Sequence, residues 1–131
     1  MINQIDQLQY ESDCWKRILE FILVENSFCK DRLSDVIRSS RGEINFMDQA
    51  EIYQNYFIQE EILISLIKSD ISFFQKLLKK KVTEDDLLVK EVMSNRKKIS
   101  KELEKLEHEF IKMKLGFNNF LEGSTLRSQA V

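Results

Sequence analysis

Three stretches of this sequence repeat apolar residues at alternating spacings of three and four, and this periodicity constrains the fold more than any other feature. An α-helix turns once every 3.6 residues, so side chains at these spacings lie along one side of a helix. Each stretch holds the pattern for about five heptads, a length typical of helical bundles and coiled coils. We call each of these lines of residues a seam.

The three seams are expected to face a common core. The first seam consists of Ile5, Leu8, Ser12, Trp15, Leu19, Ile22, Asn26, Cys29, Leu33 and Val36. The second seam consists of Phe46, Ala50, Tyr53, Phe57, Glu60, Ile64, Ile67, Ile71, Phe74 and Leu78. The third seam consists of Val89, Val92, Arg96, Ile99, Leu103, Leu106, Phe110, Met113, Phe117 and Phe120.

Residues that break helices are scarce, because the 131-residue chain has no proline and only three glycines. The first break is the segment SSRGEIN at 39–45. Gly42 is predicted to stop the first helix in a left-handed conformation, and Asn45 is a candidate cap for the second. A chain with so few turn-forming residues has few turns, which favours long helices.

The second break is the segment KKKVTEDD at 79–86, where lysines precede a run of acidic residues. Cations suit the end of one helix and carboxylates suit the start of the next. Thr83 with Asp86 resembles a capping box, with Asp in place of the usual Glu. Gly123 is expected to close the third helix.

These breaks predict helices at about 4–40, 45–81 and 84–121. Because short connections force neighbouring helices to run antiparallel, we predict an all-α, elongated up-down-up three-helix bundle or coiled coil. The bundle forms a single domain over 1–123, and 124–131 is expected to be a flexible C-terminal tail.

Charge and composition favour no nucleic-acid or membrane partner. Lys and Arg total 20, Asp and Glu total 22, and the net charge is −2. Seven lysines gather toward one end of the predicted rod, but acidic residues lie among them and no aromatic residues alternate with them. These lysines are Lys76, Lys79, Lys80, Lys81, Lys97, Lys98 and Lys101.

The sequence points to a cytoplasmic protein. The N-terminal segment has no signal-peptide pattern, and the longest clean apolar runs, such as FILV at 21–24, are far shorter than a membrane span. Cys14 and Cys29 fall on one predicted helix, about 22 Å apart at 1.5 Å per residue, so they cannot bridge each other within one chain. Two unbridged cysteines fit a reducing compartment.

The segment EKLEHEF at 104–110 brings carboxylates close to His108, the single histidine of the chain. A bundle metal site needs Glu-x-x-His pairs that point inward, but Lys105 precedes His108 by three residues, and Lys112 replaces the second histidine of a His-Glu-x-x-His motif. His108 also falls opposite the third seam. We therefore predict a solvent-exposed helix face with no metal, no cofactor and no catalytic residues.

One exposed histidine on a helical bundle of this size resembles the histidine phosphotransfer domains. That family places Lys and then Gly three and four residues after the histidine, whereas Ile111 and Lys112 occupy those positions here. Without glycine at that position, the larger Lys112 side chain would crowd a docking receiver domain. The resemblance implies an alternative function, in which His108 accepts a phosphoryl group in a signalling module.

Polar residues on the seams are predicted to set the register of the helices. Folding the chain at its two turns brings Arg96 level with Asp70, and we predict an ion pair between them; the alternative is that Arg96 extends outward into solvent. Glu60 has no equally clear partner, and Asn26 and Tyr56, which lie near its level, are candidate hydrogen-bond partners.

A second set of apolar residues lies away from the seams. Phe21, Val24 and Phe28 recur on the outer side of the first helix. The same relation holds on the second helix for Ile62, Leu66 and Phe73, with Ile52 nearer its start. The hairpin brings Phe21 level with Ile62, so we expect one central patch across the first two helices. The alternative is a wider core in which the bundle is rotated and both sets face inward.

These features predict a non-enzymatic protein that works by binding. We expect it to self-associate or to bind another helical protein through Phe21, Val24, Phe28, Ile62 and Leu66. A symmetric homodimer is the simplest solution, because the same apolar patch then serves twice. The expected role is that of an interaction or scaffold protein.

Overall fold

The computed structural model describes residues 4–40, 42–80 and 86–129, which form three long α-helices. They are α1 (Gln4–Ser39), α2 (Ile44–Leu78) and α3 (Asp86–Gln129). The all-α class and the three-helix architecture predicted from the seams are confirmed.

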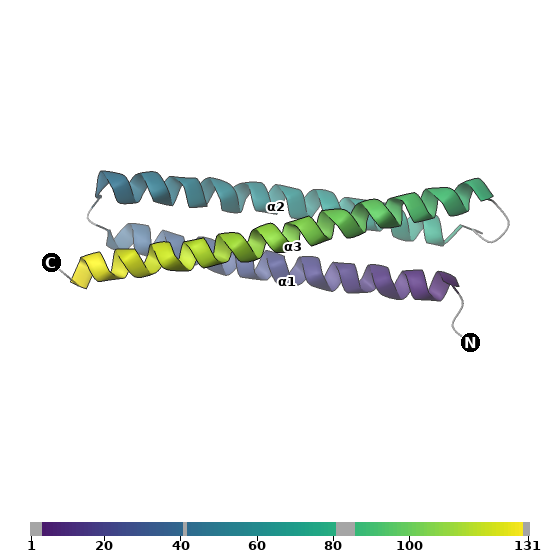
Figure 1. Cartoon of the computed structure of the whole chain (residues 1–131), viewed down its shortest axis with the longest axis horizontal. Coiled ribbons are helices and arrows are strands. Elements are labelled where there is room, and N and C mark those ends of the chain that lie inside the picture. The colour runs from purple at the N-terminus through teal and green to yellow at the C-terminus, as the bar shows by residue number, and fades with distance from the viewer. Residues whose placement is uncertain (1–3, 41, 81–85, 130–131) are drawn as a thin grey trace.

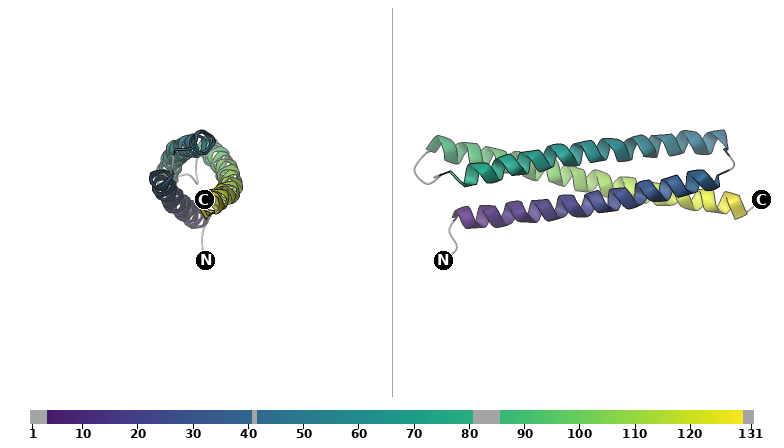
Figure 2. Two further views of the ribbon diagram at one scale, coloured as in Figure 1. Left: turned by 90° about the vertical axis from the view of Figure 1, so that its left-hand side faces the viewer. Right: turned by 180° about the vertical axis from the view of Figure 1, so that it is seen from behind.

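The helices pack antiparallel into an elongated bundle, in which α1 contacts α2, α2 contacts α3 and α3 contacts α1 (Figure 1). Seen end-on, the three helices surround a common axis (Figure 2). With three helices, the N-terminal end of α1 and the C-terminal end of α3 lie at opposite ends of the rod. A 36-residue helix such as α1 is about 54 Å long at 1.5 Å per residue.

The turn between α1 and α2 follows the glycine signal but not the predicted cap. Gly42 adopts a φ of 73°, the left-handed conformation expected of it. Asn45 lies inside α2, and Glu43 occupies the N-cap position without a side-chain cap hydrogen bond. The Met47 amide donates to the Glu43 carbonyl oxygen at 2.9 Å. The helix therefore begins at Ile44, and Asn45 lies one residue too far along the chain to be its cap.

The predicted capping box of Thr83 with Asp86 cannot be followed, because Thr83 lies outside the described residues. At the other end, α3 continues through Gly123 to Gln129 instead of ending near residue 121. Among the described glycines, positive φ occurs at Gly42, and Gly123 stays in the helix. A glycine ends a helix when it turns left-handed, and here it does not.

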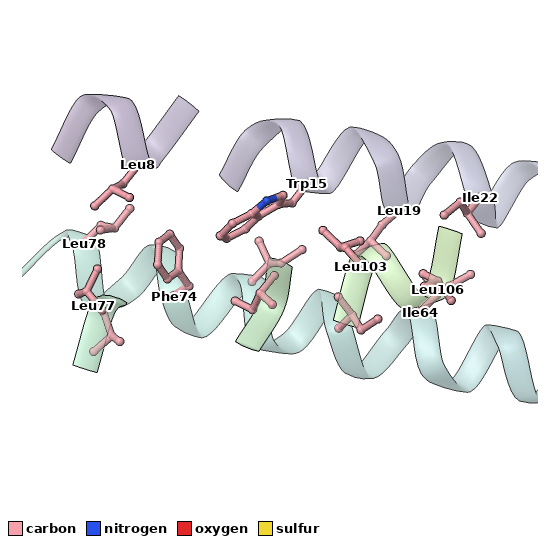
Figure 3. Close-up of a cluster of buried hydrophobic side chains, with 14 of the residues drawn as sticks. Leu8, Trp15, Leu19, Ile22, Ile64, Phe74, Leu77, Leu78, Leu103 and Leu106 are labelled. Atoms are coloured by element: carbon pink, nitrogen blue, oxygen red, sulfur yellow. The ribbon is translucent and has the colours of Figure 1, made fainter. Parts of the chain in front are cut away.

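The core forms where the three seams meet, and it divides into two clusters. The larger cluster lies toward the α2–α3 turn and includes Trp15 and Phe74, whose ring centroids are 5.1 Å apart (Figure 3). The smaller cluster lies toward the α1–α2 turn and is rich in aromatic rings, with Phe57 against Phe117 at 5.1 Å. The buried members of the smaller cluster are Cys29, Leu33, Phe46, Ala50, Phe57 and Phe117.

Two buried polar residues, Asn26 and Glu60, fall on the seams between these clusters. The Asn26 side-chain amide donates to the Phe57 carbonyl oxygen at 3.1 Å and so ties α1 to α2. Together they form a polar layer in the middle of an otherwise apolar interior.

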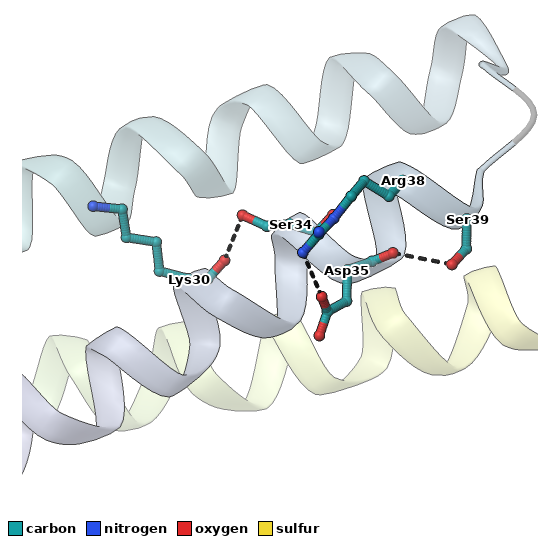
Figure 4. Close-up of polar contacts among 5 residues, drawn as sticks. All are labelled: Lys30, Ser34, Asp35, Arg38 and Ser39. Carbon is teal, nitrogen blue, oxygen red and sulfur yellow. Dashed lines mark hydrogen bonds and ion pairs between the residues drawn. The ribbon is translucent and has the colours of Figure 1, made fainter.

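The last turns of α1 are held by local polar contacts (Figure 4). Arg38 pairs with Asp35 at 2.7 Å, and the hydroxyl groups of Ser34 and Ser39 donate to carbonyl oxygens four residues earlier. These contacts join residues at the C-terminal end of α1 and do not involve the residues in the middle of the helix.

Candidate protein-interaction surface

The five apolar residues predicted to form a contact surface are all exposed. Phe21 and Phe28 expose 64% and 66% of their surface, and the other three expose between 45% and 59%. The alternative of a wider core is therefore wrong for the single chain, because the seams fill the core without these side chains. An unburied phenylalanine leaves a large apolar area in water, which favours its burial against a partner.

The outer stripe of α1, formed by Phe21, Val24 and Phe28, faces outward and leans toward α3. Glu25 marks this side, because its carboxylate pairs with Lys114 of α3 at 2.6 Å. Phe21 precedes Glu25 by four residues and Phe28 follows it by three, so both lie along the same flank of the helix.

Two exposed residues of α3 extend this stripe across the ion pair. Ile111 and Leu115 expose 58% and 62% of their surface and lie within three residues of Lys114. Neither residue was among those predicted to form the surface. Their spacing of four around a paired lysine is the signal that could have found them, but it becomes informative only once Lys114 is known to face α1.

The outer stripe of α2, formed by Ile62, Leu66 and Phe73, borders the opposite side of α3. Asp70 marks this flank through its contact with Lys98 of α3 at 3.8 Å. Leu66 precedes Asp70 by four residues and Phe73 follows it by three.

The flank of α2 that faces α1 is polar instead. Glu61 pairs with Lys30 of α1 at 3.1 Å, and the Gln75 amide donates to the Ser12 hydroxyl at 2.9 Å. The polar α1–α2 flank thus separates the two outer stripes, which form two surfaces and not the single patch that we expected. The sequence places residues at the right level along the rod, but level alone does not say on which side of the bundle they lie.

The predicted Arg96–Asp70 ion pair is wrong. Arg96 pairs with Glu11 of α1, with Nη2 to Oε2 at 2.8 Å and Nε to Oε1 at 3.0 Å. Asp70 instead contacts Lys98, which lies two residues from Arg96 and therefore on another side of α3. Arg96 lies on the α1-facing side of the third seam, so its side chain reaches the helix that Asp70 does not belong to.

The polar layer holds two ionisable groups with raised pKa values. Burial raises the pKa of the Glu60 carboxyl group, and the Glu109 carboxylate adds to this, while the nearby Tyr56 hydroxyl opposes it. Burial and the Glu60 carboxylate raise the pKa of Tyr56, so its hydroxyl stays protonated. Neither the Tyr56 hydroxyl oxygen nor Glu60 Oε1 has a hydrogen-bond partner within 3.5 Å among the described residues.

The described residues contain no group of three or more His, Cys, Asp or Glu side chains that could hold a metal ion. His108 is exposed on α3. Burial raises the pKa of the Cys29 thiol, which keeps it protonated and unsuited to nucleophilic chemistry. Cys14 is half-buried, and both cysteines are free.

A surface hollow of about 300 Å³ lies between the end of α1 and the start of α2. Asp48 and Glu51 line it, and both side chains are exposed. No helix in the described part of the chain is long and apolar enough to cross a membrane.

Comparison with known proteins gives no family model, no curated protein and no solved structure that matches this chain. The residues themselves must therefore carry any functional argument. The two outer stripes are among the exposed apolar residues that a filled core leaves unexplained, and their regular spacing sets them apart.

Proposed function

We propose that this protein is a non-enzymatic interaction module that self-associates or binds a helical protein through its exposed apolar stripes. The observation that carries the proposal is the exposure of Phe21, Val24 and Phe28 on one flank of α1. Helices present apolar side chains at this spacing to other helices, where ridges of one pack into grooves of the next. The free cysteines fit the cytoplasmic placement that we propose with it.

The second stripe supports a scaffolding role. Ile62 and Leu66 lie across the bundle from the α1 stripe, on the other side of α3. A rod with two separate apolar faces can hold two helical partners at once, or one partner and a second copy of itself.

The proposal is tested with a Phe21→Glu/Phe28→Glu variant. We expect it to lose self-association in sedimentation equilibrium, or to lose a captured protein partner, while far-ultraviolet circular dichroism shows unchanged helix content. A Ser65→Glu/Ser72→Glu variant is the matched control, because it adds the same charge at the same spacing of seven residues on exposed positions of α2, outside the α1 stripe.

Two outcomes would reject the proposal. If the Phe21→Glu/Phe28→Glu variant unfolds, these residues are structural. If it associates as the wild type does, the α1 stripe is not a contact surface. An Ile62→Glu/Leu66→Glu variant applies the same test to the second face, and loss of a different partner would support the scaffolding role.

The alternative function, phosphoryl transfer, rests on the exposed His108. A small phosphodonor such as acetyl phosphate would modify the wild type but not a His108→Ala variant if this alternative held. We expect no difference between the two chains, because Ile111 and Lys112 stand where that family has Lys and Gly.

A further inference from the structure

The outward side of α1 carries opposite charges at the two ends of its apolar stripe. Arg17, Phe21, Val24, Phe28 and Asp31 follow one another at spacings of four, three, four and three, and all are exposed. Arg17 and Asp31 each lie seven residues from Val24. Among the described residues, neither takes part in any of the ion pairs that hold the helices together.

We propose that a second copy of this chain covers the stripe, with the two α1 helices antiparallel about a twofold axis beside Val24. The inference rests on the proposed function and names its partner. A twofold contact uses the same residues on both sides, so a surface must be complementary to itself. Antiparallel pairing meets this condition here, because Arg17 of each copy faces Asp31 of the other and Phe21 faces Phe28.

The charges also select the direction of pairing. Parallel α1 helices in register would place Arg17 opposite Arg17 and Asp31 opposite Asp31, and like charges across an interface are unfavourable. The antiparallel pair has two attractive contacts in place of these two repulsive ones.

The neighbouring helix extends the same contact. The α1 stripe leans toward α3, as the Glu25–Lys114 ion pair shows. The twofold axis brings α3 of both copies to the same side of the paired α1 helices. Ile111 and Leu115, both exposed, then widen the apolar area on that side. The interface is a four-helix layer formed by α1 and α3 of each copy.

The experiment is a charge exchange followed by sedimentation equilibrium across a concentration range. Arg17→Asp places aspartate opposite Asp31 twice per dimer, and Asp31→Arg places arginine opposite Arg17 twice. Each single variant is expected to weaken the dimer about tenfold or more, since two attractions become two repulsions. The Ser65→Glu/Ser72→Glu variant serves as control and is expected to dimerise as the wild type does.

Restoration is the decisive arm. An equimolar mixture of Arg17→Asp and Asp31→Arg chains is expected to form a heterodimer of wild-type affinity, because both contacts again join opposite charges. One chain that carries both changes is expected to form a homodimer for the same reason. Circular dichroism of each variant verifies the fold, and all substituted positions are exposed.

A wild type that stays monomeric, or a dimer that does not respond to the charge changes, would overturn the antiparallel pairing. Neither result would reject the proposed function, which fails separately if the Phe21→Glu/Phe28→Glu variant unfolds or keeps every association of the wild type. The two proposals are therefore distinguishable with one set of purified variants.

Discussion

Glu60 places a carboxyl group in the middle of the bundle, where 4% of its surface remains exposed. Burial is the main reason for its raised pKa. The folded chain therefore holds the Glu60 proton more tightly than the unfolded chain does. The contribution of Glu60 to stability is complete below the ordinary carboxyl pKa of 4.5, and it is lost as pH rises through the raised pKa of the folded state.

We expect the Glu60→Gln variant to gain stability relative to the wild type as pH rises above the ordinary carboxyl pKa of 4.5. Glutamine keeps the size and polarity of the side chain but carries no proton to lose. The measurement is urea unfolding from pH 4 to pH 8, with Glu104→Gln as the control at an exposed position of α3. If the difference between Glu60→Gln and the wild type does not change with pH, Glu60 is not the group responsible.

Arg96 offers a second test on single residues, because its carboxylate partner is Glu11 and not the predicted Asp70. A double-mutant cycle with Glu11→Gln and Arg96→Met is expected to give a coupling free energy of about 0.5–1 kcal/mol, since both side chains remain partly exposed. The same cycle with Asp70→Asn in place of Glu11→Gln is expected to give a coupling close to zero. A larger coupling to Asp70 than to Glu11 would reverse the assignment.

The three glycines of the chain differ in backbone conformation and in the space around them. A methyl group added at either Gly42 or Gly123 would meet no atom within 4 Å. The two glycines differ in backbone conformation, because Gly42 has a φ of 73° and Gly123 does not have a positive φ. At Gly116 the added methyl carbon would lie 3.1 Å from the Tyr53 hydroxyl oxygen, where α3 passes close to α2.

We expect Gly42→Ala to destabilise the bundle by about 1 kcal/mol, because alanine is strained at positive φ. Gly123→Ala is expected to stabilise it by about 0.5–1 kcal/mol, because alanine is the better residue within a helix. Thermal unfolding of the two variants measures these effects. Packing does not contribute to the comparison, because the added methyl group contacts no atom at either position. Equal shifts of the same sign would contradict the assigned backbone conformations.

Sequence periodicity predicts the elements well because the seams are long and uninterrupted. Most seam residues are buried, including the polar Ser12, Asn26 and Glu60, whereas Val89 is exposed. Helix ends are less predictable, since Gly123 can stop a helix only if it turns left-handed, and nothing in its sequence context requires this. The candidate surface is predicted in its residues but not in its arrangement. Periodicity fixes which side of each helix points outward, whereas the direction in which the third helix packs fixes which outward sides adjoin.

At the scale of the whole molecule, the contrast between a filled core and exposed rings of the same type can be measured directly. Phe57 exposes 0% of its surface and Phe28 exposes 66%. Their replacement by alanine separates the residues that hold the bundle together from those that are available to a partner.

We expect Phe57→Ala to lower the free energy of unfolding by about 3–5 kcal/mol, because it removes a buried ring from the aromatic cluster. Phe28→Ala is expected to change it by less than about 0.5 kcal/mol, when measured at concentrations where the chain is monomeric. Chemical denaturation of both variants gives the comparison. A large loss of stability in monomeric Phe28→Ala would mean that this ring supports the fold.

The polar layer of Asn26 and Glu60 has a further consequence for how the rod moves. It interrupts the apolar interior between the two core clusters, so the contacts that hold one end are largely separate from those that hold the other. Such a division favours two cooperative units, each of which can open locally while the other remains closed. Amide hydrogens of the two halves should then exchange with solvent at two distinct characteristic free energies. The bundle would behave as two short domains that share the same three continuous helices.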